Sequence, residues 1–344
     1  MRYRVLGLSG LRVSELCLGA MTFGEEFGIG VAATEARRVY DEFRAAGGNF
    51  IDTANIYNRG SSERILGEFI REGREKLVLA SKYTLSSDPA DPNAGGSHRK
   101  NLMQSLDASL RRLGTDYLDV YWVHGWDRRT DLASLMRALD DQVRAGKILH
   151  VGISNAPAWV VATANTLATE RGLTPFSALQ LHYNLIERNI EADFLPMATA
   201  MNIAVTAWSP LAGGLLTGKY KESGASGRLA GPRGARTLTS RNQEVATAVA
   251  KIAARIDCRP SVLALAWLMQ RGNGGVIPII GARTVEQLRE NLTCTGLRLS
   301  PEMITELDNL APPPPTYPAS LLGSEFFQDM MYGAVRQQID WPAS

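Results

Sequence analysis

Cysteine and long apolar runs are both scarce in this sequence. Its three cysteines, Cys17, Cys258 and Cys294, are an odd number and match no metal-ligand spacing. They are therefore predicted to be packed thiols, which favours a reducing compartment. No stretch is long and apolar enough to predict a membrane span, and the N-terminal residues lack the apolar core of a secretory signal. We expect a soluble cytoplasmic protein with no membrane partner.

Excess charge of one sign is also absent, since the formal net charge is only +2. Nucleic acid or an anionic membrane as a partner would require a basic stripe or a long charged block. With 45% hydrophobic and 21% charged residues, the 344-residue chain has enough apolar side chains for one large core.

A Gly-x-Gly-x-x-Gly turn is missing after every predicted strand, which weakens an open, doubly wound sheet as the fold.

Short apolar runs alternate with amphipathic segments along most of the chain. Eight such runs, typical of buried parallel strands, bring the chain back to the same sheet after each helix, and eight units close into a (β/α)8 TIM barrel. We expect one domain over residues 1–344, with an N-terminal hairpin within residues 2–13. The open sheet remains the alternative. The predicted strands are 16–19, 49–52, 77–81, 118–123, 148–153, 177–181, 203–207 and 275–279. The predicted helices are one capped by Thr34, then 61–71, 97–113, 130–145, 157–170, 190–201 and 260–271.

Two regions depart from this alternation. Residues 212–241 are rich in glycine, serine and basic residues and are too long for a tight connection, which predicts a functional loop. Residues 312–344 begin with four consecutive prolines and continue with apolar side chains that include Phe326 and Met330. This tail is either a substrate lid or a subunit contact. The sequence does not decide between them, and it leaves the oligomeric state unknown.

Three predicted strands end in polar side chains, with Asp52 followed by Tyr57, then Lys82, then His124. Burying such groups is unfavourable unless they are partnered, and a barrel places its active site at the carboxyl ends of its strands. An ammonium group beside a phenol lowers the phenol pKa from about 10 towards the working range of a general acid. Taken singly, Tyr57 and Lys82 are typical of surface residues and His124 of a core histidine. Their combination indicates one shared site.

Several motifs make the chain resemble the aldo-keto reductases over nearly its whole length. They are Asp52-Thr53-Ala54 with Tyr57, Gly60-Ser61-Ser62-Glu63, Gly152-Ile153-Ser154-Asn155 and Trp208-Ser209-Pro210-Leu211. Trp208 and the Gly281-Ala282-Arg283 turn make the chain more similar to the aryl-alcohol-dehydrogenase-like and potassium-channel-beta-subunit-like branches than to aldose reductases. The resemblance implies the catalytic tetrad Asp52, Tyr57, Lys82 and His124. It also implies reduction of an aldehyde or ketone with NADP(H), with Tyr57 as general acid and base.

The resemblance also assigns residues to the cofactor. Ser154, Asn155 and Gln180 would bind the carboxamide, although the first two are equally typical of an N-cap for the helix at 157. Trp208 would stack on the nicotinamide, although a lone tryptophan is often a core residue. An arginine beside a helix N-terminus favours NADP over NAD. The full set is Ala20, Met21, Asp52, Ser154, Asn155, Gln180, Trp208, Ser209, Pro210, Leu211, Gly213, Lys219, Arg228, Gly281, Arg283, Gln287, Glu290 and Asn291.

The expected substrate is a small carbonyl compound held by Phe23, Tyr57, His124 and Trp126. Phe27 and Tyr83 would complete an aromatic pocket suited to aryl aldehydes, steroid-like ketones or keto-sugars. Two other functions stay open. One is a cofactor-binding regulatory subunit with little turnover, and the other is an isomerase or aldolase that uses Lys82 as a Schiff-base nucleophile, supported by the fold alone.

Overall fold

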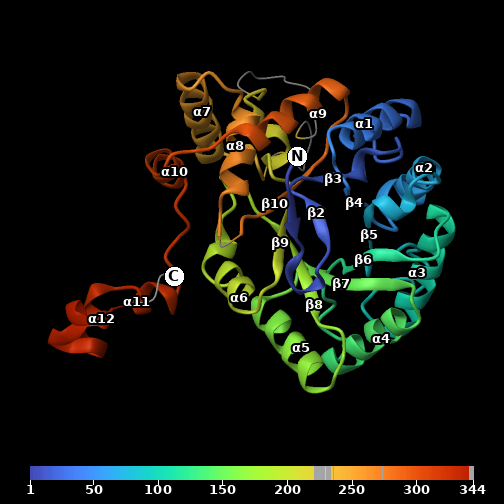
Figure 1. Ribbon diagram of the computed structural model, residues 1–344, viewed down its shortest axis with the longest axis horizontal. Coiled ribbons are helices and arrows are strands. Elements are labelled where there is room, and N and C mark those ends of the chain that lie inside the picture. Colours follow the sequence, from blue (N-terminus) through green and yellow to red (C-terminus); the bar gives the residue numbers. More distant parts are fainter. Residues whose placement is uncertain (221–228, 230–233, 235, 273, 341–344) are drawn as a thin grey trace.

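The computed structural model describes residues 1–220, 229, 234, 236–272 and 274–340 (Figure 1). Eight parallel strands form a closed barrel in the order β10-β3-β4-β5-β6-β7-β8-β9. This confirms the predicted (β/α)8 barrel and excludes the open sheet. The strands are β3 (Cys17–Gly19), β4 (Phe50–Asp52), β5 (Val78–Tyr83), β6 (Leu118–Val123), β7 (Ile148–Ser154), β8 (Phe176–His182), β9 (Ala204–Trp208) and β10 (Ile277–Ile280).

Helices cover the outside of the barrel, as Figure 1 shows. Their prediction was wrong for one N-cap and missed four helices. The N-cap of the first helix is Ala32 rather than Thr34. Helices α7, α10, α11 and α12 were not predicted, although the buried Val245, Val249 and Ile252 of α7 recur at helical spacing. The helices are α1 (Ala33–Ala45), α2 (Ser61–Phe69), α3 (Arg99–Leu113), α4 (Leu132–Arg144), α5 (Ala158–Glu170), α6 (Phe194–Ala200), α7 (Ser240–Arg255), α8 (Pro260–Met269), α9 (Val285–Leu292), α10 (Pro301–Asp308), α11 (Ala319–Leu322) and α12 (Glu325–Tyr332).

The predicted N-terminal hairpin is confirmed, and it closes one end of the barrel. Strands β1 (Tyr3–Val5) and β2 (Arg12–Ser14) pair antiparallel. Leu6 and Val13 are fully buried against the side chains inside the barrel. Gly7 has a φ of 52°, and a Cβ on it would lie 2.2 Å from the carbonyl oxygen of Ser177. Glycine is required there because the hairpin backbone lies directly on strand β8.

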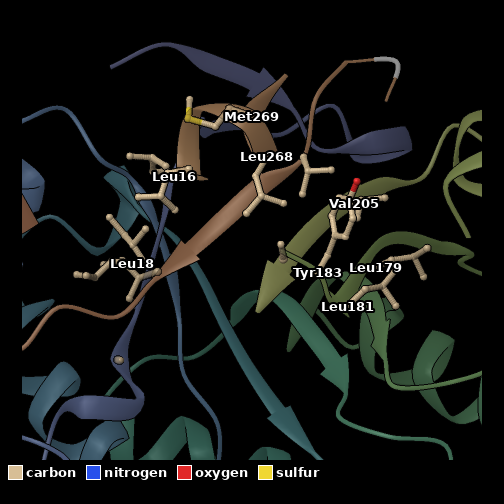
Figure 2. Close-up of a cluster of buried hydrophobic side chains, with 14 of the residues drawn as sticks. Leu16, Leu18, Leu179, Leu181, Tyr183, Val205, Leu268 and Met269 are labelled. Atoms are coloured by element: carbon tan, nitrogen blue, oxygen red, sulfur yellow. The ribbon is translucent and has the colours of Figure 1, made fainter. Parts of the chain in front are cut away.

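Alternating strand residues build two separate apolar layers. Leu16, Leu18, Leu179 and Leu181 point outward and pack in the layer beneath the helices, where Figure 2 shows them with residues of α8. Strand residues of the opposite parity point inward and, together with Leu6 and Val13 of the hairpin, form the core of the barrel itself. This inner set is Leu6, Val13, Cys17, Phe50, Val78, Ala80, Val120, Trp122, Ala178, Ile277 and Ile279.

The C-terminal helices lie apart from the barrel. Helices α11 and α12 follow the proline-rich segment and extend away from the barrel strands in Figure 1. Neither helix has a buried residue, and Phe326 and Met330 are exposed. Whether this tail is a substrate lid or a subunit contact stays a prediction. Across the part of the chain described above, every helix is too short or too polar to cross a bilayer.

Candidate active site

The period-two alternation of the strands directs the polar residues into the mouth of the barrel. Phe50 of β4 and Ala80 of β5 belong to the inner core, and two residues further on the same faces carry Asp52 and Lys82. Trp122 of β6 is followed in the same way by His124. Successive inward positions lie about 7 Å apart along a strand, so the polar groups form a layer directly above the apolar one. The sequence-predicted strand ends therefore converge on one site.

Lys82 is fully buried and uses its ammonium group to connect the site. Its Nζ donates to Asp52 Oδ2 at 2.5 Å, to the carbonyl oxygen of Thr53 at 2.8 Å and to the hydroxyl of Tyr57 at 3.2 Å. Burial acts to lower the pKa of Lys82, but Asp52 and Tyr57 outweigh it, and the pKa rises. The lysine is thus held as an ammonium with all three of its protons donated.

His124 lies beside Tyr57 and is neutral. The two rings meet edge to face, with centroids 5.9 Å apart and an angle of 84° between their planes. Burial, with a further contribution from the charge of Lys82, lowers the pKa of His124 to about 3. Its Nδ1 is buried and has no hydrogen-bond partner among the described residues. Because an orphaned N–H is rarer than an orphaned acceptor, we assign the ring proton to Nε2.

Gln180 and Ser154 belong to the same polar layer. The side-chain nitrogen of Gln180 donates to Asp52 Oδ1 at 3.0 Å, so both oxygens of that carboxylate are engaged. The hydroxyl of Ser154 donates to the carbonyl oxygen of Gln180 at 2.7 Å. These contacts link strands β7 and β8 to the tetrad.

Asn155 does not cap a helix. Helix α5 begins at Ala158 with Pro157 as its N-cap and with no side-chain cap, so the N-cap interpretation of Ser154 and Asn155 was wrong. Asn155 has a φ of 50°, is exposed, and donates from Nδ2 to the carbonyl oxygen of His124 at 2.8 Å. Its side chain is available at the mouth of the barrel.

Trp208 ends strand β9 with one face covered. Its ring stacks on that of His182 with centroids 4.0 Å apart and planes 6° apart. Only the opposite face is left for a second ring. His182 was not predicted as a site residue, although its place two residues after Gln180 puts it on the same inward face of β8. Burial lowers the pKa of His182, which keeps the stacked ring neutral.

The loop after β9 turns sharply beside Trp208. Ser209, Ala212 and Gly213 have positive φ values of 54°, 50° and 66°. The backbone N–H of Gly213 donates to the Ser209 hydroxyl at 3.2 Å. Lys219 is exposed, with its ammonium 5.0 Å from the ring centroid of Tyr220. The predicted Arg228 lies outside the described residues.

Helix α9 begins near the end of β10, with Arg283 just before its N-cap and the acidic Glu286 in its first turn. Thr284 is its N-cap, and its hydroxyl accepts from the N–H of Gln287 at 3.3 Å. The Gln287 side chain accepts from the backbone N–H of Arg283 at 3.0 Å, so it is engaged within its own loop. Glu290 accepts from the hydroxyl of Ser261. The Arg283 guanidinium forms no salt bridge with any described residue, which leaves its charge available for an anion.

Two aromatic residues expected in the substrate pocket are core residues instead. Phe23 has no exposed surface and packs edge-on against Phe69. Tyr83 is also fully buried and stacks on Tyr121, because the parity of β5 turns it away from the barrel axis. These two predictions were wrong.

Trp126 and Phe27 remain at the open side of the site. Trp126 is half-buried and Phe27 is exposed. Trp159, which was not predicted, meets Trp126 edge-on with ring centroids 5.4 Å apart. A tryptophan in the first turn of α5 gave no signal in the sequence, because its partner lies on another loop.

Asn58 is a further residue of the site that was not predicted from the sequence. It is fully buried, has a φ of 45°, and follows Tyr57 directly. Its Nδ2 donates to the carbonyl oxygens of Met21 and Phe23 at 2.9 and 3.0 Å, and its Oδ1 accepts from the N–H of Phe27 at 2.9 Å. It thereby holds the loop after β3 next to the catalytic tyrosine candidate.

Comparison with known proteins agrees with this geometry. The model of the aldo/keto reductase family matches residues 15–312. The norsolorinic acid reductase of Emericella nidulans is 40% identical over 331 residues, which cover 93% of this chain and 84% of that protein. The NADP(+) aryl-alcohol dehydrogenase of Phanerodontia chrysosporium is 35% identical over 357 residues, covering 97% of this chain and 92% of that protein. The chain therefore belongs to the aldo/keto reductase family of oxidoreductases.

Proposed function

We propose that this protein reduces an aldehyde or ketone to an alcohol with NADPH, with Tyr57 as the proton donor. The observation that carries the proposal is the arrangement of Lys82, whose buried ammonium contacts the Tyr57 hydroxyl on one side and the Asp52 carboxylate on the other. A phenol held next to a permanent ammonium is suited to give up and regain a proton.

A bound reduced nicotinamide would supply the hydride for the carbonyl carbon. Tyr57 then donates its proton to the oxygen that becomes the alcohol. The ammonium of Lys82, at 3.2 Å, stabilises the phenolate that is left, and Asp52 keeps the lysine in place. Lys82 keeps its proton throughout this step. Its raised pKa holds it as an ammonium, which disfavours the Schiff-base alternative, because that chemistry needs a neutral amine.

His124 would orient the carbonyl group. As a neutral imidazole with its proton on Nε2, it donates a hydrogen bond to the substrate oxygen without competing for the proton of Tyr57. Its edge-to-face contact with the Tyr57 ring keeps both donors on the same side of the site.

The residues at the barrel mouth fit a nicotinamide dinucleotide. Asn155 and Gln180 offer amide groups for a carboxamide, and the uncovered face of Trp208 offers a stacking surface. At the other end, Arg283 precedes the N-terminus of α9, and its guanidinium forms no salt bridge with a described residue, a combination that favours a phosphate. The 2′-phosphate of NADPH is the group that this site would select.

We further propose that the substrate is a planar aryl carbonyl compound. The edge-to-face pair of Trp126 and Trp159, together with exposed Phe27, provides aromatic surface near His124, and aromatic faces bind flat rings. The name of one relative, an aryl-alcohol dehydrogenase, points to the same class.

The test is NADPH oxidation with a panel of aryl aldehydes by the wild-type protein and by Tyr57→Phe. We expect the variant to lose at least about a hundredfold in kcat, because it lacks the proton donor, while its Kd for NADPH stays unchanged. Tyr117→Phe is the matched control and should keep full activity, because Tyr117 directly precedes β6, at the end of that strand opposite to His124. Wild-type protein that binds NADPH but oxidises none of it, or a fully active Tyr57→Phe, would overturn the proposal.

A further inference from the structure

The peptide bond between His124 and Gly125 is held from both sides by side chains of the neighbouring strands. The N–H of Gly125 donates to the hydroxyl of Thr84 at 3.1 Å. The carbonyl oxygen of His124 accepts from Nδ2 of Asn155 at 2.8 Å. Thr84 follows β5 and Asn155 follows β7, and these strands flank β6, which carries His124. One peptide unit thus has both of its polar groups bound by side chains.

Both of these residues have positive φ values, and that of Thr84 is unfavourable. Thr84 has a φ of 97°, which is a rare value for a β-branched residue, and Asn155 has a φ of 50°. Thr84 is buried, and its carbonyl oxygen accepts from the N–H of Gly96 at 2.8 Å. Such strain persists only where the surrounding contacts outweigh it. Within the described residues, the hydrogen bond of the Thr84 hydroxyl is the one from the Gly125 N–H.

His124 depends on its backbone for orientation. A functional imidazole is commonly oriented by a hydrogen bond at its second nitrogen. Here the Nδ1 of His124 has no such partner within the described residues. What remains is the packing on the Tyr57 ring, the bond from the His124 N–H to the Tyr83 carbonyl oxygen at 3.0 Å, and the peptide unit that follows.

We propose that Thr84 and Asn155 form a peptide clamp that positions the His124 imidazole for the substrate carbonyl. The inference rests on the function proposed above. Thr84 is the positioning residue, because its hydroxyl oxygen accepts the hydrogen bond from the Gly125 N–H. Asn155 has a second N–H and Oδ1 left, so a carboxamide bound to it would reinforce the same clamp from the cofactor side.

Thr84→Val tests the clamp, because valine has the shape of threonine without the hydroxyl. We expect kcat with an aryl aldehyde to fall about tenfold, equivalent to about 1.4 kcal/mol, while the Kd for NADPH stays within about twofold. Thr84→Ser keeps the hydroxyl and should retain near wild-type kcat. Equal losses in both variants, or a lower melting temperature with kcat unchanged at a temperature where the variant is folded, would refute the positioning role.

A second readout does not depend on turnover. The chain has four histidines, so the nitrogen signals of their rings can be assigned in the protein without cofactor. Thr84→Val should shift the His124 signals and leave those of His98, His150 and His182 in place. A wild-type protein with no reductase activity would defeat the proposed function while this measurement still tests the clamp. Unchanged His124 signals and unchanged kcat in an otherwise active enzyme would defeat the clamp alone.

Discussion

Replacing Asp52 with asparagine tests the central ion pair most directly. Asp52 is 2% exposed and Lys82 is fully buried, with 2.5 Å between Oδ2 and Nζ. The substitution keeps the shape but leaves an ammonium in the core without its counter-charge. Breaking a buried pair by removing one partner costs about 3–5 kcal/mol. Gln180 adds to the loss, since its Nε2 donates to Asp52 Oδ1. If the oxygen of the new asparagine faces Lys82, its amide nitrogen faces the Gln180 nitrogen, and two donors then oppose each other.

The loss should depend on pH in a defined direction. In the wild-type protein the pKa of Lys82 is raised above its ordinary value, so the ion pair stabilises the fold fully below about pH 10. In Asp52→Asn the buried lysine loses its counter-charge and its pKa falls below the unfolded value. The folded variant then binds fewer protons than the unfolded chain, so its free energy of unfolding rises with pH. The deficit should therefore be largest near pH 7 and shrink towards pH 10.

Urea unfolding followed by circular dichroism at pH 7 and pH 9.5 measures this effect, with the double variant Asp52→Asn/Lys82→Met as the control. Removing both charges should recover most of the lost stability, because no unpaired charge remains. If Asp52→Asn unfolds at the wild-type urea concentration, the pair does not hold the site together. A deficit that is the same at both pH values, or a double variant no more stable than the single one, would equally refute the reasoning.

Two further predictions concern the cofactor and the packing of the barrel. Arg283→Ala should weaken NADPH binding about 10- to 100-fold and leave NADH binding nearly unchanged, because one charge-assisted phosphate contact is lost. An unchanged ratio of the two Kd values would contradict the assignment. The control is Arg289→Ala in helix α9, because the Arg289 guanidinium pairs with Glu42. Glu63→Gln should lower the free energy of unfolding by about 2 kcal/mol, because fully buried Glu63 pairs with Arg112. The exposed ion pair of Glu35 with Arg38 should contribute little, so Glu35→Gln is the control. If Glu35→Gln unfolds at as low a urea concentration as Glu63→Gln, burial is not the cause of the loss.

Local pattern was sufficient for the barrel and for the choice of its polar strand ends. Apolar runs of four to six residues separated by amphipathic segments predict parallel strands covered by helices, and all eight strands were found. Helix α7 was missed although its local pattern was sufficient, since Val245, Val249 and Ile252 recur at helical spacing on its buried face. The long connection predicted over 212–241 accordingly ends at Ser240, where that helix begins.

The direction of a strand side chain follows from the alternation of inward and outward positions along the strand. Lys82 lies on the inward face of β5, and Tyr83, one residue later, lies on the outward face and is buried against Tyr121. Expecting Tyr83 in the pocket ignored this parity. Phe23 differs, because it lies in a loop whose path is set by the distant Asn58, and no pattern near residue 23 indicates that contact.

The sequence by itself determined which groups stand at the strand ends, because the alternation of two residues and the end of each apolar run are local properties. Only the tertiary structure decided how those groups meet. The neutral state of His124 depends on burial and on the charge of Lys82, and its peptide is held by Thr84, 41 residues away from Gly125. Such contacts depend on the register between neighbouring strands, and register is a property of the closed barrel rather than of any one segment.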